Sequence, residues 1–248
     1  MSVITDTYLK LHAKWSFQRT LAELLAKRWM EPAVPFIMML GVLTFCAVAI
    51  PNYLSLDNLA ETSSQFAEFG FVVLAMTVVL IVGGIDLSVG AIFAMADFIA
   101  LILFNVYELH IGLVLVLVLL SGGLMGACNG FLIGYLKLGA FLTTLVTLII
   151  FRATFDLTAP VFAVDIATAY NESPVWEFLG EGTLWGIPAN VCILMVIAVI
   201  GHALLSRSRP GWHIAAIGSN RKAARHAGIP INRTIFWTYV LSGMLCSL

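Results

Sequence analysis

The sequence predicts an all-α protein that crosses a membrane several times, with about six complete spans, a truncated seventh and a cytoplasmic N-terminus. Of the 248 residues, 60% are hydrophobic and only 11% are charged, against roughly 25% charged in an ordinary soluble domain. The mean hydropathy of +0.98 points the same way. At about 20 apolar residues per crossing, the chain can supply six or seven helices. We therefore expect a polytopic helical membrane protein surrounded by the lipid bilayer.

Net charge and cysteine placement argue against two other classes of protein. The formal net charge is −1, so the protein has no overall positive charge that would attract nucleic acid. The four cysteines lie singly in apolar stretches, with no CxxC spacing and no histidine at metal-ligand distance. We expect no nucleic-acid partner, no metal site and no cofactor.

Residues 1–31 are expected to form a cytoplasmic N-terminal extension. They contain five Lys and Arg residues and lack the apolar core of a cleavable signal peptide. Apolar residues at helical spacing opposite the basic ones predict a helix in the membrane interface, with a solvated tail as the alternative. These apolar residues are Phe17, Leu21, Leu24, Leu25 and Trp29.

Residues 32–248 are expected to form the transmembrane domain. Its apolar stretches are 34–50, 66–83, 87–105, 111–136, 140–157 and 187–205, with a seventh that starts near Ile235. The seventh has only 14 residues before Leu248, fewer than a crossing needs, so we expect the domain to be incomplete at its C-terminus.

Charge asymmetry sets the expected orientation. A cytoplasmic N-terminus puts the loop 206–233, which carries six Lys and Arg residues, back in the cytoplasm. The expected outside segments contain no Lys or Arg at all; they are residues 51–65, 106–110 and 159–186.

The second and third spans meet at a polar, glycine-containing break. Gly83 and Gly84 permit a turn there, and Asp86 can cap the helix that follows. Transporters often place such a break beside the solute path, because free N–H groups and short polar side chains can then meet a hydrophilic solute. Asp86 and Ser88 are therefore candidates for the path, and a tight surface turn with a capping Asp is the alternative.

Three other ionisable residues lie within predicted spans. They are Glu68, Asp97 and Arg152, and each is expected to face protein or water because exposure to lipid is costly. Arg152 can pair with one of the acids, and a structural ion pair is the simpler interpretation. Asp86 and Asp97 do not have the opposed placement on neighbouring helices that an intramembrane aspartyl protease needs.

The fourth span contains a strip of small residues. Gly122, Gly123, Gly126 and Gly130 leave one face without bulky side chains, so another helix can approach closely. Asn129 lies beside this strip, where it can either satisfy backbone groups or line a path.

The loop 206–233 contains a short predicted helix. Ser219 or Asn220 can cap it, and Gly228 with Pro230 can end it near Ala227. About eight residues are too few for a stable isolated helix, so docking into a partner is one explanation and a solvated basic loop is the other. The residues suited to docking are Ala223, Ala224 and Ala227 for close approach, and Arg221, Lys222 and Arg225 for polar contacts.

Three ordered segments resemble the permease subunits of bacterial ATP-binding-cassette importers for ribose, xylose, arabinose and galactose. The first is the run GGIDLSVG at 83–90. The second combines NGFLI at 129–133 with the segment around Lys137 and FLTTL at 141–145. The third is AIGSN at 216–220 with the following AAR and GI.

The resemblance implies a subunit that forms the path for a monosaccharide and does no covalent chemistry. It implies three partners: a cytoplasmic ATPase, a periplasmic sugar-binding protein and a second permease subunit. Sugar hydroxyls would be met near Gly83, Gly84, Asp86, Ser88 and Asn129. The ATPase would dock on the loop; the residues implied there are Gly218, Asn220, Ala223, Ala224, Arg225 and Gly228.

Two other function classes are weaker. An ion-coupled secondary transporter of a small polar solute would not need the docking loop and typically shows repeated halves, which this chain lacks. A membrane enzyme is disfavoured because no HExxH or GxSxG motif occurs. No Walker-type GxxxxGK[ST] sequence occurs either, so ATP hydrolysis would have to come from a partner.

Overall fold

The computed structural model describes residues 30–169, 171 and 173–248, and these residues form an all-α protein as predicted. The predicted interfacial helix within residues 1–31 lies almost wholly outside the described residues. The chain divides into two compact units, residues 1–59 and 60–248. In the first unit, helix α3 (Met30–Ala49) is followed by the start of α4.

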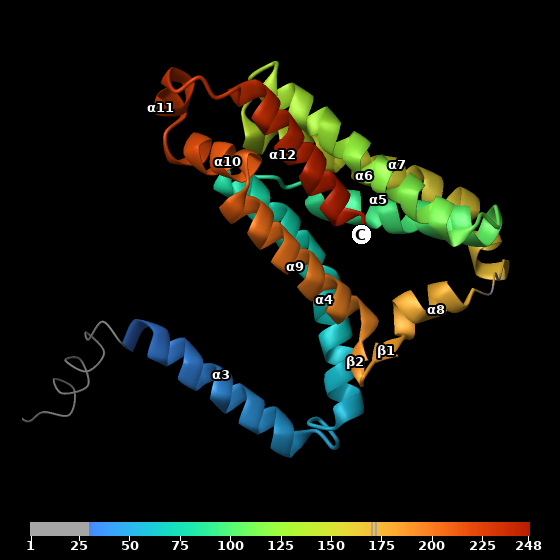
Figure 1. Ribbon diagram of the computed structural model, residues 1–248. Helices are drawn as coiled ribbons and strands as arrows, with labels where there is room; N and C mark the ends of the chain where they lie inside the picture. Colours follow the sequence, from blue (N-terminus) through green and yellow to red (C-terminus); the bar gives the residue numbers. More distant parts are fainter. Residues whose placement is uncertain (1–29, 170, 172) are drawn as a thin grey trace, which may run out of the picture. The chain divides into compact units, whose positions relative to one another are not determined.

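The second unit is built almost entirely from helices (Figure 1). Its long apolar helices are α4 (Leu56–Ile81), α5 (Val89–Leu101) continued by the π-helix η1 (Ile102–Val106), α6 (Ile111–Gly134), α7 (Ala140–Thr168) and α9 (Ala189–Arg207). The shorter helices are α8 (Pro174–Glu181), α10 (Arg209–Ser219), α11 (Arg221–His226) and α12 (Ile231–Cys246). Strands β1 (Thr183–Leu184) and β2 (Ile187–Pro188) form a small antiparallel hairpin between α8 and α9.

The predicted spans correspond to helices. Among the described residues, five helices are long and apolar enough to cross a membrane, and Ala33–Ala49 is a shorter apolar helix. Inside a bilayer only a helix or a closed barrel satisfies all backbone groups internally, so long apolar runs become helices.

Two predicted loops are shorter than expected. Residues 51–65 are expected on the outer side between the apolar stretches 34–50 and 66–83, and in the structure α4 already begins at Leu56. The side chain of Ser55 accepts a hydrogen bond from the Asn58 N–H at 3.3 Å, which starts α4 one residue after Ser55. Likewise, α7 continues through Pro160 to Thr168, so the expected loop 159–186 begins as helix.

Helices α6 and α12 are in contact along their lengths, as the small-residue strip predicts. A Cβ atom added at Gly130 would lie 2.7 Å from the Phe236 carbonyl oxygen, and one added at Gly134 would lie 2.8 Å from that of Asn232. At Gly126 the added atom would overlap the carbonyl oxygen of Tyr239. The backbones of the two helices therefore touch directly.

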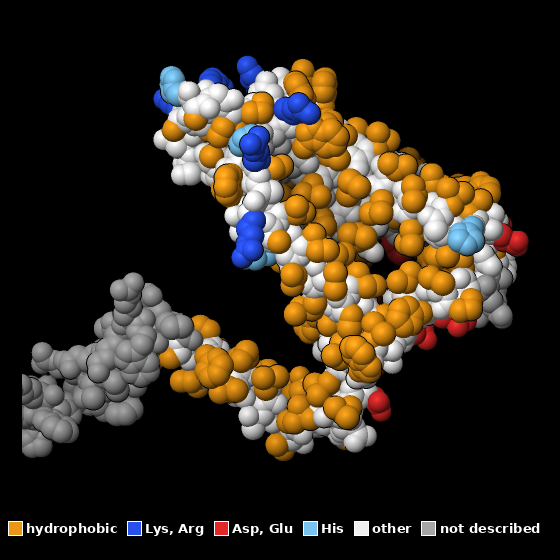
Figure 2. All heavy atoms as spheres, in the orientation of Figure 1, with side chains coloured by type: hydrophobic (Ala, Val, Ile, Leu, Met, Phe, Trp, Pro, Cys, Tyr) orange, Lys and Arg blue, Asp and Glu red, His pale blue; other side chains and the backbone are white. Residues whose placement is uncertain are grey.

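A hydrophobic core joins the end of α4 to α10, α11 and α12. Tyr239 is fully buried in it, and the other buried members are Val78, Val79, Val82, Ile133, Ile214, Ile217, Ala224, Ile231 and Ile235. Figure 2 shows Lys and Arg side chains gathered over α10 and α11, next to a broad apolar surface on the long helices. This core positions the basic loop at one end of the spans.

Candidate functional site

The connection between α4 and α5 is a tight turn. The N–H of Gly84 donates to the Val79 carbonyl and that of Gly83 to the Leu80 carbonyl, both at 3.0 Å, which is the Schellman pattern of a helix end. Gly83 has a φ of +82°, a conformation that favours glycine. The predicted turn at these two glycines is confirmed.

Asp86, Ser88 and Asn129 form one continuous hydrogen-bonded network. The Ser88 N–H and Oγ both donate to Asp86 Oδ1, at 2.9 and 2.6 Å. Asn129 Nδ2, from α6, donates to Ser88 Oγ at 2.7 Å. The structure therefore joins Asn129 to Asp86 and Ser88, which lie about forty residues earlier in the sequence, and ties the α4–α5 turn to α6.

All three side chains of this network are 0% exposed. Asp86 holds the backbone of its own turn at Ser88, and the Ser88 side chain, at the N-cap of α5, makes no capping bond. Burial raises the pKa of the Asp86 carboxyl, and the hydrogen bonds from Ser88 lower it. In this conformation no solute can touch these side chains.

Several polar atoms in this region have no hydrogen-bond partner. They are Asp86 Oδ2, Asn129 Oδ1, Tyr239 Oη and Ser242 Oγ, all buried. A Cβ atom added at Gly84 would lie 2.7 Å from Tyr239 Oη, so this hydroxyl group packs against the turn. A buried polar group without a hydrogen-bond partner destabilises the folded protein. Apolar side chains would pack here without that cost, so these polar groups are not explained by packing alone.

Thr144 completes the surroundings of the turn. Its Oγ1 donates to the Ile85 carbonyl at 3.2 Å, and it is fully buried on α7. Sequence reasoning missed Thr144 and Tyr239, because both contacts join segments that are distant in sequence.

The membrane acids Glu68 and Asp97 line a common cavity of about 520 Å³. Asn190 and Trp176 also line it, and Trp176 stacks on Phe104 with ring centroids 4.3 Å apart. Asn190 Nδ2 donates to Ser64 Oγ at 2.7 Å, which joins α9 to α4. Both acids are exposed on the described part of the chain, and their expected placement toward protein or water stays a prediction.

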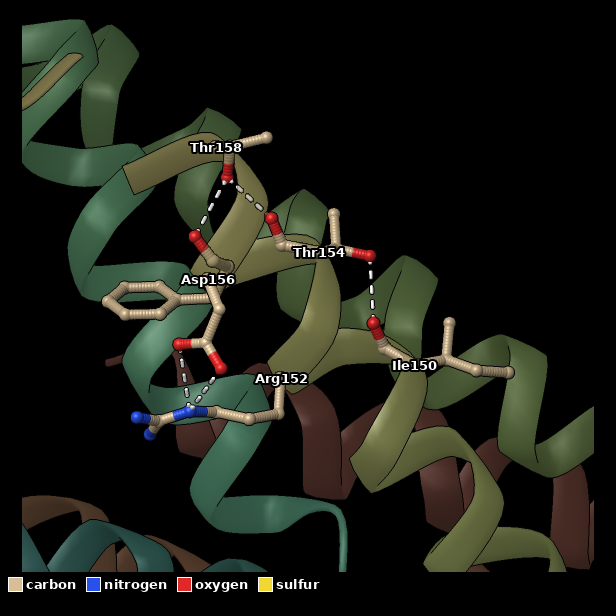
Figure 3. Close-up of polar contacts among 6 residues, drawn as sticks. Ile150, Arg152, Thr154, Asp156 and Thr158 are labelled. Carbon is tan, nitrogen blue, oxygen red and sulfur yellow. Dashed lines mark hydrogen bonds and ion pairs between the residues drawn. The ribbon is translucent and has the colours of Figure 1, made fainter. Parts of the chain in front are cut away.

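Arg152 pairs with an acid that the sequence analysis did not consider. Its Nε lies 3.1 Å from Asp156 Oδ1, four residues further along α7 (Figure 3). The guanidinium also lies over the Phe155 ring, 5.5 Å from its centroid. The structural ion pair is confirmed, but the partner is neither Glu68 nor Asp97.

Both members of this pair are exposed, with 61% and 55% of their side-chain surfaces accessible. The neighbouring hydroxyl groups of Thr154 and Thr158 bond to carbonyls of their own helix, as Figure 3 shows. A charged pair in the middle of a membrane helix has to face protein or water, because lipid does not solvate it.

The basic loop contains the predicted short helix. Asn220 Oδ1 accepts from the N–H groups of Lys222 and Ala223, at 3.1 and 3.0 Å, and caps α11. At the other end Gly228, with φ +76°, donates to the Arg225 carbonyl at 3.1 Å. Both predicted ends are confirmed.

Two of the residues implied to contact a partner face the protein itself instead. Ala224 is 3% exposed and belongs to the core that joins α4 to α12. A Cβ atom at Gly218 would overlap the Ile81 carbonyl oxygen, so Gly218 packs on the end of α4. The exposed face of α11 consists of Arg221, Lys222, Ala223, Arg225 and His226.

Comparison with known proteins adds independent information. Residues 58–248 match the family described as "Branched-chain amino acid transport system / permease component". The chain is 29% identical over 214 residues to the ribose import permease protein RbsC of Haemophilus influenzae, covering 86% of this chain and 65% of that protein. It is 27% identical over 222 residues to RbsC of Escherichia coli, covering 90% and 68%.

A third relative is the L-arabinose transport system permease protein AraH of Escherichia coli. It is 33% identical over 208 residues, covering 82% of this chain and 60% of that protein. The chain thus spans between 60% and 68% of the length of these three relatives. No solved structure matches the chain.

Proposed function

The chain belongs to the branched-chain amino acid transport system permease family, and from this premise we propose that it is the membrane subunit of an ATP-binding-cassette importer for a monosaccharide. With several apolar helices that can span a membrane, it is a multi-pass inner-membrane protein. Members of this family are transport components, so the chain itself would do no covalent chemistry.

The observation that carries the proposal is the shape of the basic loop. Helix α11 has only six residues, is capped at both ends and rests on the core through Ala224. Such a short helix is not stable alone, yet here it is fixed with a basic face exposed. A rigid, protruding element of this kind suits docking into a cytoplasmic ATPase.

The proposal includes the orientation and the partners. The N-terminus and the loop 206–233 lie in the cytoplasm, where the ATPase binds. A periplasmic binding protein delivers the sugar on the opposite side, and a second permease subunit completes the path. ATP-driven movement of α11 would switch the spans between outward-open and inward-open states.

A monosaccharide is the solute class that the relatives favour. The names of the similar permeases specify ribose and L-arabinose, whereas the family description specifies branched-chain amino acids. An amino acid zwitterion needs groups that compensate a charge of each sign, such as charged side chains or helix ends, while a neutral sugar needs only hydrogen-bonding groups. Direct comparison of the two solutes in uptake decides between them.

The α4–α5 turn has its own place in this proposal. We propose that the turn borders the path and that the network of Asp86, Ser88 and Asn129 fixes its shape. Because these side chains are fully buried, direct contact with sugar hydroxyls would require a different conformation of the turn.

The test is purification of the protein in mild detergent with identification of the bound subunits, followed by uptake into proteoliposomes. We expect a cytoplasmic ATPase among the bound subunits, and ATP-dependent uptake of a pentose but not of leucine. Sugar accumulation driven by a proton or sodium gradient without an ATPase would contradict the importer and favour the ion-coupled transporter.

A further inference from the structure

A basic cavity of about 450 Å³ lies where α6 ends and α12 begins. Its lining includes the cationic side chains of Lys137, Arg225 and Arg233 and no Asp or Glu. Within residues 30–169, 171 and 173–248, none of these three side chains forms an ion pair, the only such pair being that of Arg152 and Asp156. Three like charges around one cavity repel one another, and a bound anion would relieve that repulsion.

The first turn of α12 adds backbone donors to this cavity. Ile231, Asn232 and Arg233 begin the helix and line the cavity. Pro230 precedes them and supplies no side-chain cap. The free N–H groups and the positive end of the helix dipole therefore favour an anion at the same place as the three cationic side chains.

A second cavity of about 390 Å³ lies along α12. The two cavities share Pro230 and Arg233. The second is lined mostly by apolar groups of α10 and α12, and Trp237 on its wall is 56% exposed. Its lining is Pro210, His213, Ile214, Pro230, Arg233, Thr234, Trp237, Thr238 and Leu241.

We propose that these two cavities together bind one anionic phospholipid. Its phosphate lies in the basic cavity and one acyl chain lies in the apolar groove beside Trp237. A free phosphate ion would use only the basic cavity, whereas a lipid uses both. Basic pockets between the ends of membrane helices are typical sites for anionic headgroups, and Figure 2 shows basic side chains beside apolar surface in this region. The inference does not depend on which solute is transported.

The experiment measures quenching of Trp237 fluorescence by lipids with brominated acyl chains. The protein in dodecyl maltoside is titrated with brominated phosphatidylglycerol or brominated phosphatidylcholine. The Trp237→Phe variant identifies the signal of this tryptophan. We expect phosphatidylglycerol to quench Trp237 at a mole fraction at least tenfold lower than phosphatidylcholine.

A paired set of variants tests the site itself. Lys137→Gln with Arg233→Gln removes two charges from the cavity and should abolish the preference for phosphatidylglycerol, a loss of roughly tenfold or more. Arg207→Gln with Arg209→Gln removes the same charge from residues outside the cavity lining and should keep the preference.

Three results would overturn the inference. The first is equal quenching by the two lipids, and the second is a preference that survives the Lys137→Gln, Arg233→Gln change. The third is displacement of phosphatidylglycerol by millimolar inorganic phosphate, which would indicate a site for a free anion. If the second result came with loss of ATPase binding, the two charges would be assigned to contact with the ATPase. Co-purification of the ATPase with the unaltered protein is measured separately. Failure of the importer proposal can therefore be distinguished from failure of the lipid proposal.

Discussion

Replacement of Gly126 by Ala tests whether the backbones of α6 and α12 must touch. The added Cβ would overlap the Tyr239 carbonyl oxygen and lie 3.0 Å from the Tyr239 carbonyl carbon and 3.2 Å from Gly243 Cα. Ordinary carbon contacts lie at about 3.5–4.0 Å. All three obstructing atoms belong to the backbone of α12, so no side chain can rotate away and the helices must separate.

The expected cost follows from two opposing effects. Overpacking of a well-packed contact costs about 1–3 kcal/mol, and the upper end applies because separation also loosens the contacts at Gly122 and Gly130. Ala improves helix propensity over Gly by about 1 kcal/mol. Gly201→Ala in α9 is the matched control, because an added Cβ there meets nothing within 4 Å. The difference between the two variants cancels the propensity effect and isolates an overpacking cost of about 3 kcal/mol.

Thermal unfolding in detergent, followed by tryptophan fluorescence, measures this difference. For a chain of this size 1 kcal/mol corresponds to about 2–4 °C in Tm, so Gly126→Ala should melt about 6–12 °C below Gly201→Ala. Equal melting temperatures would show that the helices have room between them and that the close contact is not a source of stability.

Further predictions concern the turn and the loop. Asp86→Asn keeps a hydrogen-bond acceptor for Ser88 and should retain transport in the reconstituted complex. Asp86→Ala leaves buried donors unpaired at a cost of about 1–3 kcal/mol and should lose transport. An inactive Asp86→Asn variant in an intact complex would show that transport requires the negative charge itself. Ala223→Trp should reduce co-purification of the ATPase at least tenfold without lowering Tm, and unchanged association would refute docking on α11. Ala224→Trp should lower Tm because this side chain is buried, so a melting curve like that of the Ala223 variant would contradict its place in the core. Gly83→Ala should lower the unfolding free energy by more than about 1 kcal/mol because of its φ of +82°, measured by the same melting assay.

Features that depend on local chemistry were predictable from the sequence. Long apolar runs identify the membrane helices, because the backbone has no other way to bond inside lipid. Gly83 and Gly228 both adopt a positive φ, at turns that follow a helix. Asn220 caps α11, as its position in the sequence suggests. The early start of α4 had a signal too, since Ser55 is a favourable N-cap followed by Asp57.

Features that depend on contacts between distant segments were not predictable. The strip of small residues on α6 predicts a close neighbour but cannot identify α12. Likewise, nothing in the local sequence shows that Ala224 faces the core while Ala223 faces outward. The Arg152–Asp156 pair is a different case, because its spacing of four residues is a recognised helical pattern and was visible in the sequence.

The backbone contact between α6 and α12 has a mechanical consequence. Only residues 227–230 separate α11 from α12, and α12 lies against α6 without intervening side chains at several positions. A displacement applied at α11 would therefore be passed to α12 and α6 together. Because Asn129 on α6 bonds to Ser88, the same displacement would also reach the turn between α4 and α5.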